Sequence, residues 1–310
     1  TGGAGFLGSW LCDSLILLKS DIISIDNLST GKKSNIKHLL IKPNFNFIES
    51  DISQYDDIKK ADYILHFASR ASPEDYQNYP IDTLMSSALG TYNLLEKARK
   101  LDSVIVYAST SEVYGDPDII PTPETYIGRI DPLMLRSCYS QGKLFSESLL
   151  KSFEKEYGLD IRIVRLFNTY GPRLRPDGTY GRVISRFIMQ SLLNQNLTVY
   201  GDGSQTRSFC YVKDAIFGIL KIIENKNAKG HVFNIGNPEE NTILEIAKKI
   251  IQLTQSSSSI SFCELPVGDP KRRCPNIDKS TKILGWKPKE SLIPGLNKTI
   301  NWVREYINEK

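Results

Sequence analysis

Short runs of apolar, mostly β-branched residues alternate with longer amphipathic stretches through the first two thirds of the chain. The apolar runs predict strands at residues 22–26, 45–49, 63–67, 104–108, 161–167 and 232–235. Between them, apolar residues recur at steps of three and four, which predicts helices near residues 6–18, 84–98 and 144–157. This alternation is typical of a parallel sheet that helices cover on both faces.

The pattern changes after about residue 171. A segment rich in Gly, Pro and Arg, residues 171–181, predicts a loop, and a helix at 183–193 and a strand at 197–200 follow. Thr242 and Glu245 have the spacing of a capping box, which predicts a helix over 243–253. We therefore expect an α/β protein. Residues 1–170 form a doubly wound, Rossmann-type parallel sheet, which the strand at 231–236 rejoins, and residues 171–310 form a smaller C-terminal α/β lobe.

Composition excludes several classes of function. The chain has 310 residues, 40% of them hydrophobic, which suffices for a core without disulfides. Its net charge of +4 is mild and dispersed outside residues 271–273, so we expect no nucleic-acid partner. It has no long apolar run and no secretory pattern, so we expect no membrane contact. Five cysteines without CxxC spacing and three scattered histidines favour a reducing, cytoplasmic compartment and no metal.

Three glycines at GxxGxxG spacing open the first predicted helix. Gly2 permits a tight turn, Gly5 lets a pyrophosphate approach the helix N-terminus, and Gly8 lets the helix pack closely on a strand. Asp26 ends the next strand, 18 residues after Gly8, where a carboxylate binds an adenosine 2′-hydroxyl and repels a 2′-phosphate. Asp51 follows the second strand and is expected beside the adenine. The pattern favours NAD over NADP, with a purely structural turn as the alternative.

A tyrosine and a lysine form the candidate catalytic pair. Tyr139 and Lys143 lie four residues apart, on one helix face, and an ammonium near a phenol lowers the phenol's pKa. Such a pair takes a hydroxyl proton while a hydride leaves the same carbon. Thr110 follows the strand at 104–108, at the edge of the sheet where sites of this fold lie, and is expected to hydrogen-bond the substrate hydroxyl. The alternatives are a surface helix pair and a loop cap.

These motifs, together with HFASRASPEDY, RLFNTYGPR, LTVYGDGSQTRSFCYV and GDPKRRCPNID, make the chain similar to a known family. Over essentially its whole length it resembles the extended short-chain dehydrogenases/reductases, the NAD-dependent epimerase/dehydratase family of nucleotide-sugar enzymes. The triplet Thr110-Ser111-Glu112 with SRASP, SQTRSF and GNPEENTI most resembles the branch that decarboxylates UDP-glucuronate to UDP-xylose.

The resemblance implies a mechanism. Tyr139, helped by Lys143 and Thr110, takes the proton of the sugar's 4-hydroxyl, NAD accepts the hydride, and the resulting 4-ketone allows CO₂ to leave before the hydride returns. Glu112 and Arg207 match family residues near the departing carboxylate, where Glu112 positions water or disfavours the carboxylate. The resemblance also implies a homodimer through the helices at 84–99 and 139–157.

The motif match carries further contacts over to this chain. Implied cofactor contacts are Gly2, Gly5, Phe6, Leu7, Asp26, Asn27, Ser29, Thr30, Gly31, Asp51, Ile52, Phe67, Ser69, Ala108, Tyr139, Lys143 and Thr169. Implied nucleotide-sugar contacts, mainly from the C-terminal lobe, are Asn168, Arg182, Tyr200, Gln205, Arg207 and Arg273, and the implied catalytic set is Thr110, Ser111, Glu112, Tyr139, Lys143 and Arg207.

The chain also departs from the family pattern. Residues 84–87 are Leu-Met-Ser-Ser where related decarboxylases read Leu-Lys-Thr-Asn, and the loop at 175–181 is two residues longer. The family has a short strand before the glycine loop, so with Thr1 as the first residue we expect the native start to be missing. The sheet would then have a gap beside the cofactor, and the chain as it stands would be unstable.

Three other activities remain open. A UDP-sugar 4-epimerase uses the same scaffold, but it needs no acid at the position of Glu112. A nucleotide-sugar 4,6-dehydratase typically has Asp where this chain has Ser111, although some use Thr-Ser-Glu. A dinucleotide-binding sensor without catalysis is disfavoured by the intact Thr110, Tyr139 and Lys143.

Overall fold

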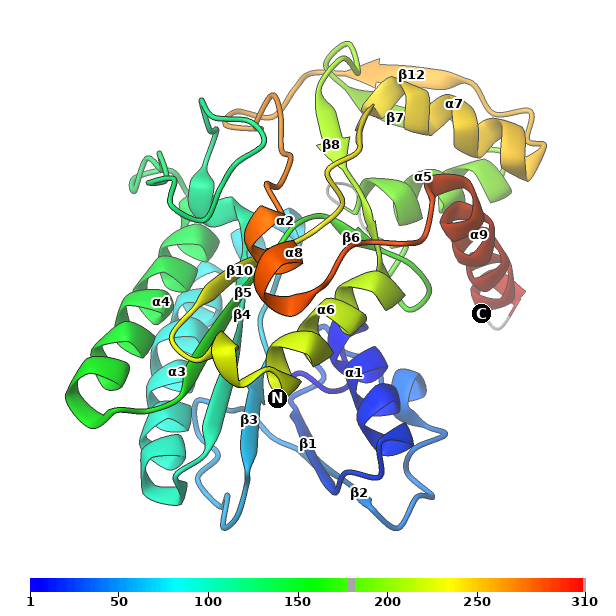
Figure 1. Cartoon of the computed structure of the whole chain (residues 1–310). Helices are drawn as coiled ribbons and strands as arrows, with labels where there is room; N and C mark the ends of the chain where they lie inside the picture. Colours follow the sequence, from blue (N-terminus) through cyan, green and yellow to red (C-terminus); the bar gives the residue numbers. More distant parts are fainter. Residues whose placement is uncertain (178–181, 309–310) are drawn as a thin grey trace.

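The computed structural model describes residues 1–177 and 182–308 (Figure 1). Its helices are α1 (Phe6–Leu17), α2 (Pro73–Asn78), α3 (Pro80–Leu101), α4 (Ser137–Tyr157), α5 (Val183–Leu192), α6 (Val212–Glu224), α7 (Ile243–Thr254), α8 (Asp278–Leu284) and α9 (Leu292–Asn308). Short 3₁₀ helices are η1 (Lys33–Ile36), η2 (Ser111–Tyr114) and η3 (Lys226–Ala228).

The strands are β1 (Ile22–Asp26), β2 (Phe45–Glu49), β3 (Tyr63–His66), β4 (Val104–Thr110), β5 (Ile161–Leu166), β6 (Thr169–Tyr170), β7 (Leu197–Tyr200), β8 (Thr206–Ser208), β9 (Cys210–Tyr211), β10 (Val232–Ile235), β11 (Glu240–Thr242) and β12 (Ile260–Cys263). All six strands predicted for the first lobe, the late one included, are present. β4 runs two residues further than expected and carries Thr110 at its end.

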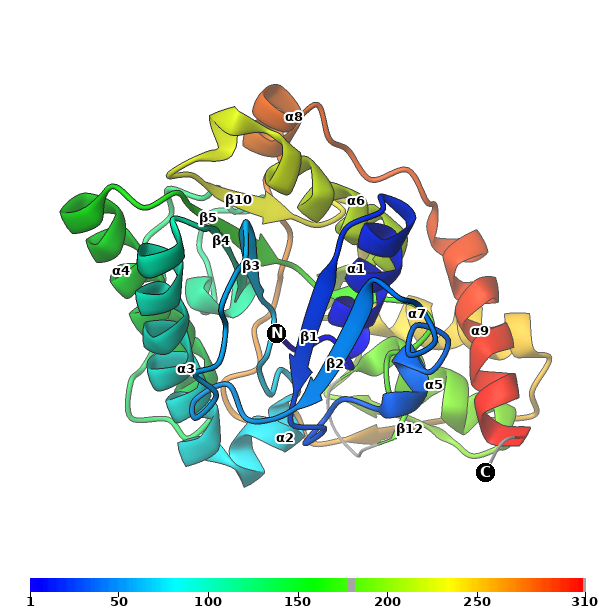
Figure 2. The same ribbon diagram turned by 90° about the horizontal axis from the view of Figure 1, so that it is seen from below.

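The N-terminal lobe is built on parallel strands. One sheet has the order β10-β5-β4-β3, and β1 and β2 pair separately (Figure 2). Among the described residues no strand lies between β3 and β1, and the backbone of Thr1 and Gly2 lies there instead. The Thr1 amino group donates to the Leu65 carbonyl (2.7 Å), and the Gly2 amide donates to the Ile25 carbonyl (2.8 Å).

Both faces of the four-stranded sheet are buried. α3 and α4 lie side by side against one face, and α6, with α1 beside it, lies against the other (Figure 2). Alternate residues of β4 follow this division, since Ile105 and Tyr107 pack with Leu94 of α3 while Val106 packs with Ile219 of α6. The continuous apolar run of β4 therefore reflects a strand buried on both sides.

The second lobe contains α5, α7 and α9 with three two-stranded sheets, β7-β12, β8-β11 and β6-β9 (Figure 1). The capping box is confirmed, because the Glu245 amide donates to the Thr242 hydroxyl and the Thr242 amide to the Glu245 carboxylate. β10 returns to the first lobe and pairs with β5, as the late apolar run predicted. Part of the predicted loop at 171–181, residues 178–181, lies outside the described residues. Within residues 1–177 and 182–308, no helix is long and apolar enough to cross a membrane.

Candidate active site

A cavity of about 750 Å³ opens between the two lobes at the carboxyl ends of β1, β3, β4 and β5. Every candidate residue from the sequence lines it, with Gly31 as the exception. A side chain on Gly31 would touch the Asp26 carboxylate (2.9 Å) and Ala4 (3.0 Å). Gly31 therefore packs against Asp26, and its contact with the cofactor stays a prediction.

The glycine loop forms a cradle that only glycine allows. Gly2 has a φ of +74°, and a Cβ there would lie 2.7 Å from the Ala68 nitrogen. A Cβ on Gly8 would lie 2.0 Å from the Gly2 carbonyl oxygen. Gly5 directly precedes α1, and Gly5, Phe6 and Leu7 all line the cavity. The unpaired backbone N–H groups of the first helical turn therefore lie at the cavity. This cradle fits the pyrophosphate of a dinucleotide.

Two carboxylates mark the end of the cavity beside β1 and β2. Asp26 is buried and accepts hydrogen bonds from the amides of Ala4 (3.0 Å) and Leu28 (2.8 Å), and its burial raises its pKa. Burial acts on Asp51 in the same direction, but hydrogen bonds from Ser53 and Asn27 hold its pKa below the ordinary value. Hydroxyl donors suit these acceptors and a 2′-phosphate does not, so the residues present fit NAD.

Tyr139 and Lys143 lie on one face of α4, and both are buried. Burial and the nearby Glu112 carboxylate raise the pKa of Tyr139, against a hydrogen bond with Thr110 and the charge of Arg273. Burial lowers the pKa of Lys143 to about 7. The Lys143 amine donates to the Ala108 carbonyl (2.8 Å) and lies 5.8 Å from the centre of the Tyr139 ring. The pKa of Tyr139 is therefore raised and not lowered as expected, because burial is the largest of these influences.

The acid of the triplet pairs with an arginine other than the one expected. Glu112 lies 3.6 Å from the guanidinium of Arg273 and accepts a hydrogen bond from the Tyr76 hydroxyl (3.3 Å). Arg207 instead donates to Asp269 (2.7 Å), which also lies 3.7 Å from Arg136. Arg207 thus lies with Asp269 and not with Glu112, and its place at the substrate carboxylate stays a prediction. Arg273 is the arginine beside Glu112, and its buried Nε has no hydrogen-bond partner among the described residues.

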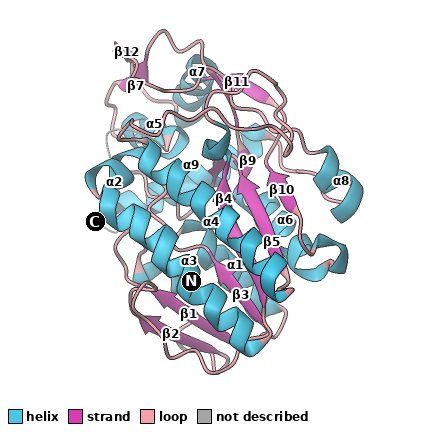
Figure 3. Ribbon diagram, turned by 90° about the vertical axis from the view of Figure 1, so that its left-hand side faces the viewer, coloured by secondary structure: helices cyan, strands magenta, loops and turns pink. Residues whose placement is uncertain are grey.

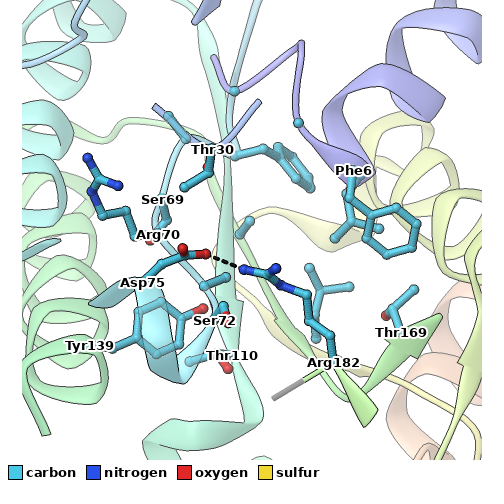
Figure 4. Close-up of a pocket in the computed structure, with 18 of the residues that line it drawn as sticks. Phe6, Thr30, Ser69, Arg70, Ser72, Asp75, Thr110, Tyr139, Thr169 and Arg182 are labelled. Atoms are coloured by element: carbon cyan, nitrogen blue, oxygen red, sulfur yellow. Dashed lines mark hydrogen bonds and ion pairs between the residues drawn. The ribbon is translucent and has the colours of Figure 1, made fainter. Parts of the chain in front are cut away.

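An ion pair spans the middle of the cavity. Arg182, at the start of α5, reaches across to Asp75 of α2, on the side where Tyr139 and Thr110 lie (Figure 4). The Arg175 guanidinium lies 3.8 Å from Asp75 and 3.0 Å from the Asp177 carboxylate. Sequence reasoning assigned Arg182 to the substrate and missed its partner. The run Glu74-Asp75 two residues after Ser72 was the available signal, but it also has the ordinary form of an acidic first helical turn.

The remaining candidates come from loops after the strands. Asn168 and Thr169 follow β5, and Gln205, before β8, donates to the Tyr200 carbonyl (2.8 Å). The segment that departs from the family pattern contributes Met85 and Ser86 to the lining, while Ser87 is buried against α4. The charged lining residues that sequence reasoning missed are Arg70, Asp75, Asp82, Arg136, Arg173, Arg175, Arg186 and Asp269. Among the described residues no group of His, Cys, Asp and Glu is arranged to hold a metal ion.

Comparison with known proteins gives consistent matches. Residues 1–236 match the model of the NAD dependent epimerase/dehydratase family. The chain is 42% identical to UDP-glucuronic acid decarboxylase 1 of Xenopus tropicalis over all of its length and 72% of that protein. It is 43% identical to UDP-glucuronic acid decarboxylase 3 of Arabidopsis thaliana over 96% of this chain and 85% of that one.

Solved structures show the same architecture. The UDP-glucuronic acid 4-epimerase of Bacillus cereus, in complex with UDP-glucuronic acid and NAD, superposes with a TM-score of 0.88 at 31% identity over 98% of both chains. A UDP-glucose 4-epimerase of Thermotoga maritima, solved with UDP-glucose, gives a TM-score of 0.89 at 31% identity over 99% of this chain and 98% of that one.

Proposed function

The chain belongs to the NAD-dependent epimerase/dehydratase family, and we propose that within it the chain decarboxylates UDP-glucuronate to UDP-xylose with internal recycling of NAD. The relatives with 40–44% identity over 96–100% of the chain carry the name UDP-glucuronic acid decarboxylase, which supports this activity. The glycine cradle, Asp26 and Asp51 would hold the cofactor. When bound, NAD supplies the oxidant that takes a hydride from the sugar's carbon 4 and later returns it.

One observation carries the choice of reaction: the Glu112–Arg273 pair lies next to Tyr139. A guanidinium binds a carboxylate through a planar fork, and Arg273 has a buried donor still available for it. An epimerase needs to turn the sugar but has no need to fix its carboxylate. Glu112 adds a second negative charge there, which favours departure of the substrate carboxylate as neutral CO₂.

The chain's residues then divide the work. Tyr139 takes the proton of the sugar's 4-hydroxyl through its phenol oxygen, with Thr110 hydrogen-bonded to that oxygen. Lys143, in its protonated form, favours the phenolate electrostatically from the same helix face. Loss of the hydroxyl proton and the hydride makes carbon 4 a ketone, which stabilises the carbanion left when CO₂ departs from carbon 5. A proton from water then replaces CO₂ on carbon 5, before the hydride returns to carbon 4. Arg273 orients the carboxylate for the loss of CO₂, and Tyr139 returns its proton at the end.

The structural neighbours support a second candidate, 4-epimerisation of UDP-glucuronate, because one of them is an epimerase in complex with UDP-glucuronic acid and NAD. Proton NMR of the products after incubation with UDP-glucuronate and NAD separates the two. We expect UDP-xylose. UDP-galacturonate would overturn the decarboxylase in favour of the epimerase, and accumulation of a 4-keto pentose with NADH would indicate an oxidative decarboxylase.

Two variants test the assignment within the site. Arg273→Gln should lower the rate of CO₂ release far more than it lowers affinity for UDP, because its partner is the sugar carboxylate. Arg207→Gln, whose present partner is Asp269, is the matched control and should mainly raise KM. The opposite pattern would indicate that Arg207, and not Arg273, binds the carboxylate of the substrate.

The proposal includes a homodimer in a reducing, cytoplasmic compartment. α3 and α4 run side by side on one face of the molecule (Figure 3), and Leu89, Tyr92 and Phe145 are 44–52% exposed on these helices. An apolar surface on two adjacent helices favours burial against a second copy. All five cysteines are free, which supports a reducing compartment. Sedimentation of the wild type and of Phe145→Glu tests the dimer, since only the variant should sediment as a monomer.

A further inference from the structure

Three side chains at four-residue steps along α4 meet the end of β4. Tyr139 is hydrogen-bonded with Thr110, and Lys143 donates to the Ala108 carbonyl (2.8 Å). One turn further on, Glu147 accepts a hydrogen bond from the Ser109 hydroxyl (2.5 Å). This helix face thus contacts three consecutive strand residues, Ala108, Ser109 and Thr110. Glu147 does not line the cavity.

On its other side, the Glu147 carboxylate contacts Arg165 of β5. It is buried, and Arg165 donates to it through Nε (2.9 Å) and Nη2 (2.7 Å). Arg165 also donates to the Glu124 carbonyl (3.2 Å), and its guanidinium lies 4.7 Å from the centre of the Tyr114 ring. A bidentate pair of this kind fixes both side chains. Glu147 therefore links β4, α4 and β5 through one rigid group.

The charged and titratable groups that face Lys143 come from three elements. Tyr139 and Glu147 lie on its own helix, the Tyr107 ring of β4 lies 4.7 Å from its amine, and His66 of β3 is close enough for Lys143 to lower the pKa of the imidazole. Glu112 and Arg273 act on Tyr139 from the opposite side. Of these groups, the carboxylate that acts on Lys143 is that of Glu147.

We propose that Glu147 is a positioning residue for the Tyr139–Lys143 pair. It fixes the register of α4 against the end of β4 through Ser109, and it places a carboxylate one helical turn after Lys143. The proposal rests on the proposed function only in its kinetic part, since the contacts and the charge exist whatever the product. Burial drives the Lys143 amine toward its neutral form, and the Glu147 charge opposes burial.

Glu147→Gln removes the charge and keeps the shape. The amide oxygen can still accept from Ser109 and from Nε of Arg165, whereas the amide nitrogen cannot accept from Nη2, so circular dichroism first checks that the variant folds. We expect NMR of ¹³C-labelled lysine side chains, assigned with Lys143→Arg, to show Lys143 titrating about one pH unit lower than in the wild type. The alkaline limb of the pH profile of kcat should shift to lower pH by the same amount, because Lys143 then loses its proton at a lower pH. Glu156→Gln, the same change on the exposed side of α4, should move neither.

A second variant tests the register. Ser109→Ala keeps the Glu147 charge and removes the tether to the strand, so kcat should fall severalfold with the alkaline limb unmoved. If Glu147→Gln folds and leaves the Lys143 titration unchanged, the electrostatic role is refuted. If it does not fold, Ser109→Ala decides, and an unchanged kcat in that variant overturns the proposal. The titration needs no turnover, so a failure of the proposed reaction in the wild type remains distinct from a failure of this proposal.

Discussion

Lys143→Met should make the protein more stable at neutral pH while it abolishes turnover. The Lys143 amine is 2% exposed and its pKa is lowered from 10.5 to about 7 by burial. Between these two values the unfolded chain keeps the lysine proton and the folded chain does not. The stability of the wild type therefore rises with pH through this window, and the cost of the buried amine is complete below pH 7. Methionine has similar length and no charge, so the variant lacks that cost.

The size of the effect follows from the same values. One pH unit of separation corresponds to about 1.4 kcal/mol of unfolding free energy. From pH 7 to pH 9 the unfolded amine stays protonated and the folded amine becomes neutral, so the advantage of Lys143→Met should shrink by about 2 kcal/mol. Taking the difference between the two proteins cancels the titration of every other group that both share.

Urea denaturation of the wild type and Lys143→Met at pH 7, 8 and 9 measures this change. Lys155→Met, an exposed position on the same helix, controls for the loss of a positive charge and for helix propensity. A difference between wild type and Lys143→Met that stays constant from pH 7 to 9 would refute the reasoning, because the amine would then titrate alike in the folded and unfolded chain.

Three further outcomes follow from the site. Tyr139→Phe should lower kcat by about 10³-fold and leave NAD affinity unchanged by calorimetry, and a wild-type rate would refute Tyr139 as the base. Asp75→Asn frees Arg182 for the substrate diphosphate, so KM should fall severalfold at low salt and less at high salt; a raised KM would contradict this. Gly8→Ala places a Cβ 2.0 Å from the Gly2 carbonyl oxygen, so NAD affinity should be lost, and tight NAD binding would contradict the cradle.

Most of the N-terminal lobe follows from local signals. Short runs rich in β-branched and aromatic residues predict strands, and β1, β2 and β10 begin and end where these runs placed them. The cofactor site could be predicted in the same way, because the glycine spacing and the acids at the strand ends are local sequence patterns. The short β8, β9 and β11 were not predicted, because two- and three-residue strands carry no period.

The partners of charged residues were harder to predict. Arg207 was expected beside Glu112 and Arg273 among the nucleotide-sugar contacts, and only the packing of the C-terminal loop on η2 brings Arg273 to Glu112 and leaves Arg207 with Asp269. The direction of the pKa of Tyr139 was also missed, because burial depends on the whole fold. The four-residue spacing of Tyr139, Lys143 and Glu147 is visible in the sequence, but their contacts with the end of β4 could not be predicted from it.

The central claim is decarboxylation with internal recycling of NAD. Its most direct test is the stoichiometry of CO₂ release from UDP-glucuronate labelled with ¹³C in the carboxylate, followed together with NADH absorbance. We predict one labelled CO₂ and one UDP-xylose for each UDP-glucuronate consumed, with no net NADH. Consumption of UDP-glucuronate without labelled CO₂, or labelled CO₂ matched by an equal amount of NADH, would contradict the account.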